Sequence, residues 1–114
     1  MWNEPNKKRL ASIPRIGAND KKRTSLGDIP IHLHFFIGGC DWYIAEYDQH
    51  DIFFGFAILH DDKINAEWGY ISFKELKSIS INGMFEIDCE NEQWFPIQAA
   101  KEIEKIANCP YGII

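Results

Sequence analysis

Aromatic and acidic residues are concentrated in one block of the chain, residues 35–73. This block holds 11 of the 16 aromatic residues, and its runs alternate between apolar and polar positions. Alternation with a period of two is typical of strands that bury one face. Burial of an aromatic ring stabilises a fold strongly, because each ring removes a large apolar surface from water. The block therefore predicts a sheet at the centre of the fold and contains the best candidates for a binding surface.

Short apolar runs separated by turn residues define the strands. Residues 52–59 are apolar at both odd and even positions, which predicts a central strand covered on both faces. Gly38-Gly39 provides a turn before this strand, and Asn82-Gly83 provides another turn after it. The predicted strands are residues 30–37, 41–48, 52–59 and 66–71, followed by either a fifth strand over 79–88 or a hairpin that turns at Asn82-Gly83.

Helical signals are short and lie mostly outside the aromatic block. Ser72 and Glu75 have the spacing of a capping box, which predicts a helix over about residues 73–78. Pro96 begins a run with apolar residues at helical spacing, which ends at Asn108-Cys109-Pro110. A further short helix is possible over about residues 6–12. We therefore predict an α+β fold, an antiparallel sheet of four to six strands with a short helix after strand four and a C-terminal helix packed on one face.

Charge is divided unevenly along the chain. Residues 1–24 carry a net charge of +5, whereas residues 25–114 carry −10. We expect residues 1–28 to be a basic, partly flexible N-terminal arm and residues 29–114 to be a single α+β domain. An acidic body repels nucleic-acid phosphates and suits a protein partner with a basic surface. The basic positions of the arm are Lys7, Lys8, Arg9, Lys21, Lys22 and Arg23.

Composition indicates a cytoplasmic protein of one domain. The chain has 114 residues, 46% of them hydrophobic, and no apolar run approaches the roughly 18 residues of a membrane span. Its first ten residues are charged and polar, unlike a signal peptide. The three cysteines lack C-x-x-C spacing and are expected to be reduced. Cys40 follows two glycines, where a thiol could be exposed for attack, but without a motif for a base we favour a buried structural thiol.

Two histidines raise the question of a metal. His32 and His34 would lie on one face of a strand, about 7 Å apart. A metal would need a third ligand from Cys40, Glu46 or His60, and no recognised zinc spacing is present. We therefore predict no metal and no cofactor, and expect the two imidazoles to be hydrogen-bonded or to face solvent.

Glu46 and Glu67 are candidates for chemistry because we expect them on neighbouring strands, flanked by aromatic residues. If the strands pair with matching parity, the two carboxylates would face each other, an arrangement suited to general acid–base catalysis. The alternatives are that they contact a ligand or partner, or that they satisfy structural hydrogen bonds. We favour a non-enzymatic protein and assign no catalytic residue.

The aromatic residues are more numerous than one face of a small sheet can bury, so some are expected at the rim. Rings near strand ends commonly mark partner surfaces. Their neighbours are acidic, which favours a protein partner over single-stranded nucleic acid, because stacked bases also need basic residues beside them. The predicted partner-binding residues are Trp42, Tyr43, Glu46, Asp48, Glu67, Trp68 and Tyr70.

Several motifs in order resemble those of the bacterial domain-of-unknown-function family 2958. The segments are Phe35-Phe36, residues 41–48 (DWYIAEYD), residues 53–56 (FFGF) and residues 67–76 (EWGYISFKEL). The family's pattern has H-F-F, W-Y-V-x-E-x-D, F-F-G-Y and E-x-G-Y-F-S-x-x-E-L, and the resemblance covers roughly residues 10–100. It implies a compact cytosolic protein of plasmids, phages and integrated elements, often encoded near DNA-handling and anti-restriction genes. The basic arm and residues 101–114 depart from the family pattern.

From these features we predict an interaction protein of a mobile element. It would present an acidic, aromatic-edged surface to a basic partner and inhibit a host defence nuclease of the kind that anti-CRISPR or anti-restriction proteins block. Two alternatives remain: a small enzyme that uses the Glu46 and Glu67 pair, and a protein that binds single-stranded nucleic acid through the basic arm.

Overall fold

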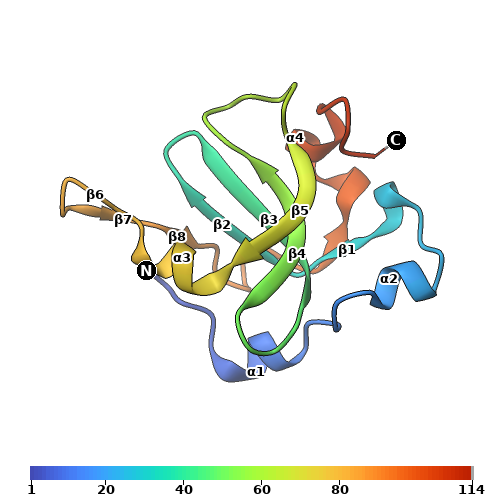
Figure 1. Ribbon diagram of the computed structural model, residues 1–114, viewed down its shortest axis with the longest axis horizontal. Coiled ribbons are helices and arrows are strands. Elements are labelled where there is room, and N and C mark those ends of the chain that lie inside the picture. The colour runs from blue at the N-terminus through green and yellow to red at the C-terminus, as the bar shows by residue number, and fades with distance from the viewer. Residues whose placement is uncertain (114) are drawn as a thin grey trace.

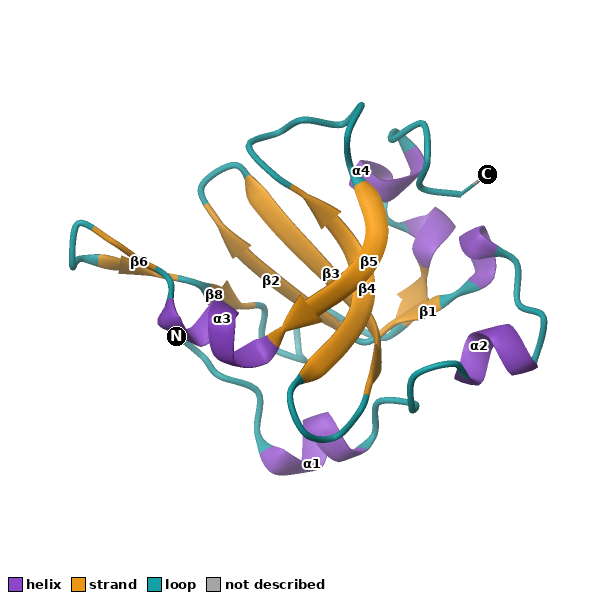
Figure 2. Ribbon diagram, viewed as in Figure 1, coloured by secondary structure: helices purple, strands orange, loops and turns teal. Residues whose placement is uncertain are grey.

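The computed structural model describes residues 1–113, and its centre is a five-stranded antiparallel sheet (Figures 1 and 2). The strand order is β5-β4-β3-β2-β8, so four strands that are consecutive in the chain lie side by side. This arrangement confirms the α+β class and the antiparallel sheet. The strands are β2 (Leu33–Ile37), β3 (Cys40–Tyr47), β4 (Ile52–Ile58), β5 (Glu67–Ser72) and β8 (Asp88–Cys89).

Two small two-stranded sheets accompany the central one. β1 (Pro30–Ile31) pairs with β9 (Gln98–Ala99), and β6 (Ser80–Ile81) pairs with β7 (Phe85–Glu86). The hairpin of β6 and β7 turns at Asn82-Gly83, where both residues have positive φ, 55° and 65°. Of the two alternatives for residues 79–88, the hairpin is therefore confirmed, because the Asn-Gly pair tolerates a backbone conformation that ends a strand.

The helices are short. They are α1 (Lys7–Ala11), α2 (Ala18–Lys21), α3 (Phe73–Ser78) and α4 (Glu104–Ala107), with single 3-10 turns η1 (Leu26–Asp28) and η2 (Ala100–Glu102). The Ser72 hydroxyl accepts a hydrogen bond from the amide of Glu75, as predicted, and α3 begins at the next residue after Ser72. The cap and the apolar residues of α3, Phe73 and Leu76, fix this helix at the end of β5.

The prediction of one continuous C-terminal helix over residues 96–107 is wrong. Residues 98–99 are extended as β9, and Ile103 interrupts the remaining helical residues with an extended backbone. The backbone of residues 98–99 is extended because β9 pairs with β1. The Ala100 amide continues this pairing by donating a hydrogen bond to the Ile29 carbonyl. The apolar side chains at the predicted spacing, including Ile106, are nevertheless buried.

Both faces of the sheet are covered, and the helices lie on opposite faces rather than on one. Each face of the sheet packs against its own hydrophobic core, and alternate residues of β3 point into different cores. Trp42 and Ile44 belong to the first core, and Tyr43 and Ala45 belong to the second. The first core includes the buried residues of α3, whereas the second includes Ala100, Ile103 and Ile106 of the C-terminal segment. The prediction that the helices pack on one face is therefore corrected. β4 contributes Phe53 to one core and Phe56 to the other, so it is the doubly covered central strand that was predicted.

A β-bulge in β3 changes which face its last residues meet. The pairing with β4 shifts between Ile44 and Glu46, so Glu46 pairs with Phe54 and Tyr47 with Phe53. Gly55 lies opposite the bulge, and a Cβ at this position would be 2.1 Å from the Tyr43 carbonyl oxygen. The bulge therefore requires glycine at residue 55.

The N-terminal arm is joined to the sheet at several points. The Trp2 amide donates to the Ile87 carbonyl, and the Cys89 amide donates to the Trp2 carbonyl. Farther along the arm, Ile13 is buried in the first core. Residues 1–28 thus contact the folded body at several points, and Trp2 covers the β8 edge of the sheet. No helix within residues 1–113 is long and apolar enough to cross a membrane.

Candidate functional site

Three of the seven predicted partner-binding residues are inside the protein. Trp42, Tyr43 and Glu46 expose 8%, 3% and 3% of their surface. They are buried because β3 is an inner strand covered on both faces, so a partner would not reach them. We therefore leave these three residues out of the candidate surface.

Glu46 has a structural environment that the sequence did not reveal. Its carboxylate accepts hydrogen bonds from the Gly17 amide at 2.8 Å, the Asn19 amide at 3.0 Å and the Asn19 Nδ2 at 2.8 Å. The bulge directs Glu46 toward the segment that begins α2, and these three donors satisfy its buried charge. Glu46 thus ties the arm to β3.

Glu46 and Glu67 do not form a pair. Glu46 is in register with Phe54, whereas Glu67 is in register with Ala57, three residues farther along β4. Ala57 packs against the first core, and Phe54 lies on the opposite face with Trp68, which packs against the second core. The two carboxylates therefore lie on opposite faces, and the geometry for acid–base catalysis by this pair is absent.

Asp48 is a turn residue. Its Oδ1 accepts from the amides of His50, Asp51 and Ile52 at 2.8–3.0 Å. Hydrogen bonds from the backbone, first from Asp51 and then from His50, hold the pKa of this carboxyl below its usual range. The side chain shapes the β3–β4 hairpin rather than pointing free into solvent.

The remaining predicted residues, Glu67, Trp68 and Tyr70, lie together on β5 at one edge of the sheet. Trp68 is half-buried and donates from Nε1 to the Gly112 carbonyl at 2.9 Å. Tyr70 is 71% exposed, and its ring meets Phe54 edge-on with a centroid distance of 5.6 Å. Phe54 also stacks on Trp68 at 5.8 Å, so the rings form a continuous aromatic row beside the edge.

The outer side of β5 has unpaired backbone groups. The Phe73 amide donates to the Asp51 carbonyl, which makes this a hydrogen-bonded pair of the antiparallel ladder. Because such pairs alternate with non-bonded pairs, the N–H and C=O groups of Trp68 and Tyr70 point away from β4. Within residues 1–113, no other backbone segment forms hydrogen bonds with Glu67–Ser72. The β8 edge differs, since Trp2 covers it.

A cavity of about 290 Å³ adjoins this row on the side of α2. Tyr70 and Phe54 form its aromatic wall, and the exposed carboxylate of Asp20 is its free acidic group, because that of Glu46 is already satisfied. The lining is Ile16, Gly17, Asn19, Asp20, Thr24, Leu26, Ile29, Glu46, Phe54 and Tyr70.

The two histidines are separated in role. His34 is buried in a charged network: its Nε2 lies 2.7 Å from Asp41 Oδ1, and its Nδ1 lies 2.6 Å from Glu90 Oε1. Lys105 donates to the other Asp41 oxygen at 3.0 Å. The sequence did not identify this network, although His34 and Asp41 flank the Gly38-Gly39 turn closely enough to face each other across it.

The network lies among packed aromatic rings. The His34 ring lies flat on Tyr43, with a centroid distance of 4.4 Å and an angle of 6°. None of His34, Asp41 and Tyr43 lines a cavity described for residues 1–113. In the same part of the chain, no group of three or more His, Cys, Asp or Glu side chains is placed to hold a metal ion.

The three cysteines are free and buried. Burial raises the pKa of Cys89 to about 11, and burial also raises the pKa of Cys109. Cys40 accepts from the His60 amide at 3.4 Å, with the His60 ring 3.9 Å from its sulfur. These environments are those of structural thiols, in which the unreactive protonated form is favoured for Cys89 and Cys109.

The basic residues of the arm fall in two places. Lys7, Lys8 and Arg9 are on α1, and Lys21, Lys22 and Arg23 are at α2, which lies apart from α1 in Figure 1. Arg9 donates to the Glu90 carbonyl at 2.8 Å and is half-buried. The six residues thus do not form one continuous basic stripe.

Comparison of the chain with protein-family models, with curated proteins and with solved structures finds no significant match. The resemblance to family 2958 therefore stays a prediction.

Proposed function

We propose that this protein is a non-enzymatic interaction module that binds an extended, basic segment of a partner protein along the free edge of β5. The observation that carries the proposal is the outward-facing backbone of Trp68 and Tyr70 beside the exposed ring of Tyr70. An edge strand of this kind is a template for strand addition, in which the main chain supplies affinity and side-chain pockets supply specificity.

The edge lacks the features that usually prevent strand addition. Natural proteins protect edges with lysine, proline, bulges or a covering segment. β5 contains no lysine or proline, pairs with β4 without a register shift, and has Glu67 as its single charged residue. The opposite edge is covered by Trp2, so the sheet has one protected edge and one open edge.

The charge near β5 selects the chemistry of the partner. Residues 51–75 carry five carboxylates and two lysines, a net charge of −3. The adjoining cavity offers the rings of Phe54 and Tyr70 to an aliphatic stem, and the Asp20 carboxylate to a cation. A lysine or arginine side chain fits this combination, because its stem is apolar and its head is positive. Phosphate groups would be repelled by the same carboxylates.

The identity of the partner rests on the resemblance to family 2958. If that resemblance holds, the partner is a nucleic-acid enzyme of a host defence system, and the acidic body blocks its nucleic-acid groove. The binding of a basic segment at β5 does not depend on that assignment.

Selection from a displayed library of random short peptides tests the proposal. We expect enrichment of peptides with lysine or arginine in an extended apolar context, and slower hydrogen exchange of the Trp68 and Tyr70 amides when they bind. Tyr70→Pro removes an outward N–H that the β4 ladder does not use, so it should abolish binding while the protein stays folded.

Matched substitutions distinguish the edge from general surface effects. Glu67→Lys should weaken binding, whereas Glu104→Lys on α4 should not. Tyr70→Ala should weaken binding, whereas Tyr111→Ala, which removes another exposed tyrosine, should not. Peptides that bind Tyr70→Pro as well as the native protein, or that protect amides elsewhere, would show the proposal to be wrong.

A further inference from the structure

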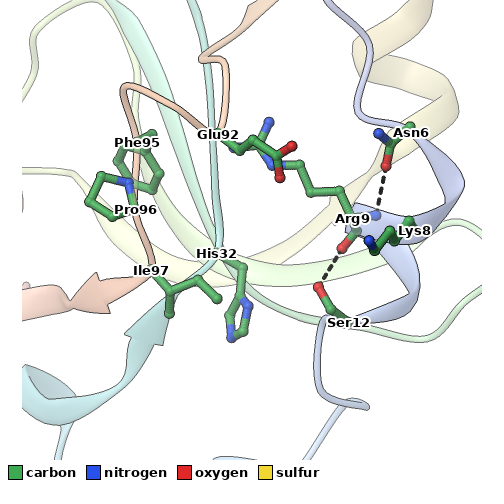
Figure 3. A pocket seen from close by; sticks show the side chains of 9 residues that line it. All are labelled: Asn6, Lys8, Arg9, Ser12, His32, Glu92, Phe95, Pro96 and Ile97. Atoms are coloured by element: carbon green, nitrogen blue, oxygen red, sulfur yellow. Dashed lines mark hydrogen bonds between the residues drawn. The ribbon is translucent and has the colours of Figure 1, made fainter.

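A second cavity, of about 320 Å³, lies between α1 and residues 92–97, away from β5 (Figure 3). In Figure 3, Phe95, Pro96 and Ile97 lie along one side, and the residues of α1 lie along the other. The lining is Asn6, Lys8, Arg9, Ser12, His32, Glu92, Phe95, Pro96 and Ile97. Its volume is at the lower end of the range for small-ligand cavities.

Local hydrogen bonds fix the basic side of this cavity. Asn6 Oδ1 accepts from the Arg9 amide at 2.8 Å, and the Ser12 hydroxyl donates to the Arg9 carbonyl at 2.8 Å (Figure 3). These bonds hold both ends of the short helix α1. Arg9 Nη1 donates to the Glu90 carbonyl at 2.8 Å, so the guanidinium is held beside the cavity and is not free in solvent.

Both unsatisfied buried side-chain atoms of residues 1–113 belong to residues that line this cavity. They are Arg9 Nη2 and His32 Nδ1, neither of which has a hydrogen-bond partner. Folded proteins leave few buried polar atoms without a partner. Both atoms have almost no accessible surface, so they lie beneath the lining of the cavity. The polar side chains of the lining that a ligand can reach directly include those of Lys8 and Asn6, which are exposed.

The charges of the lining favour an anion with a single negative charge. Lys8 and Arg9 are cationic and Glu92 is the only carboxylate of the lining. Burial lowers the pKa of His32, so its ring is neutral near pH 7 and can donate from one nitrogen. A dianion such as phosphate would be repelled by Glu92 and would leave the apolar side of the cavity unused.

We propose that this cavity binds a small organic carboxylate that carries an apolar group. The carboxylate pairs with the exposed ammonium of Lys8, near the positive charge of Arg9, and the apolar group packs on Phe95, Pro96 and Ile97. This site is separate from the β5 edge, so either proposal can fail without the other.

Titration with sodium benzoate, followed by calorimetry and by NMR of the histidine rings, tests the proposal. We expect saturable binding that moves the His32 signals but not those of His50, an exposed histidine. Benzamide, which has the same ring without the charge, should bind at least about tenfold more weakly, because a charge-assisted hydrogen bond contributes about 1.5–3 kcal/mol. Inorganic phosphate should not displace benzoate.

Neighbouring lysines provide a matched control. Lys8→Gln should weaken benzoate binding by about tenfold. Lys7→Gln, which changes the adjacent lysine outside the lining, should leave binding unchanged. Glu92→Gln should strengthen binding by removing a repulsive charge. Absence of benzoate binding, equal binding of benzamide, or equal loss in the Lys7 and Lys8 variants would overturn the proposal.

Discussion

Replacement of Glu46 by glutamine tests how the arm is attached to the sheet. The native carboxylate accepts three hydrogen bonds, one from Gly17 at Oε1 and two from Asn19 at Oε2. A glutamine has one acceptor oxygen and one NH2 group, so whichever way it turns, an NH2 must face a donor. The better orientation keeps the two bonds to Asn19 and sacrifices the bond from Gly17.

The number of hydrogen bonds lost sets the expected loss of stability. Loss of one bond to a charged acceptor costs about 1.5–3 kcal/mol, and the two bonds that remain lose their charge assistance. We therefore expect Glu46→Gln to lower the free energy of unfolding by about 3 kcal/mol, which corresponds to a fall in Tm of roughly 10 °C for a domain of this size. Asn19→Ala, which removes the side-chain donor but keeps both backbone donors, should cost about half as much.

Urea unfolding followed by tryptophan fluorescence, together with calorimetry, measures both variants. Glu67→Gln is the control, because Glu67 is exposed and should change the free energy of unfolding by less than about 0.5 kcal/mol. If Glu46→Gln were as stable as the native protein, the carboxylate would not hold the arm, and a role for Glu46 outside structure would have to be considered again.

The remaining predictions concern the bulge, the charged network and the capped helix. Gly55→Ala should destabilise the protein by more than about 3 kcal/mol, because its Cβ would meet the Tyr43 carbonyl; soluble yield and urea unfolding measure this. Burial opposes ionisation of Asp41, but hydrogen bonds from His34 and Lys105 outweigh this effect and lower its pKa. The free energy of unfolding should therefore fall as the pH drops below about 4. In unfolding experiments, Asp41→Asn should show a flatter dependence of stability on pH. Ser72→Ala should cost about 1 kcal/mol by removing the cap of α3, as thermal unfolding would show.

The strands were predictable from sequence because alternation and turn residues are local signals. β2 and β4 lie within the predicted ranges, β3 and β5 are each shifted by one residue from theirs, and Asn82-Gly83 marked the hairpin that the chain adopts. The capping box identified α3 for the same reason. Each of these features is set by residues a few positions apart, so a single sequence contains the necessary information.

The candidate site was only partly predictable because it depends on contacts between distant segments. The bulge before Glu46 leaves no clear local signal, yet it decides which face this residue meets. Trp42 and Tyr43 are the same residue types as Trp68 and Tyr70. The first two are buried because β3 lies inside the sheet, whereas Tyr70 is exposed because β5 lies at its edge. Strand order, which sets exposure, was beyond the sequence.

The C-terminal segment shows a related failure. Its apolar residues have helical spacing and are buried, but pairing of Gln98–Ala99 with β1 requires an extended backbone within the predicted helix. The charged network of His34, Asp41, Glu90 and Lys105 likewise joins four separate segments. Tertiary pairing overrode local propensity in the first case and created the network in the second.

The most direct test of the proposed function is residue-level hydrogen exchange of the Trp68 and Tyr70 amides in a complex with a selected basic peptide. Strand addition at β5 predicts that both amides exchange slowly in the complex and rapidly in the free protein, while the amides of the β8 edge are unchanged. If both amides exchange at the same rate with and without a bound peptide, the partner does not pair with β5, and the central claim is contradicted.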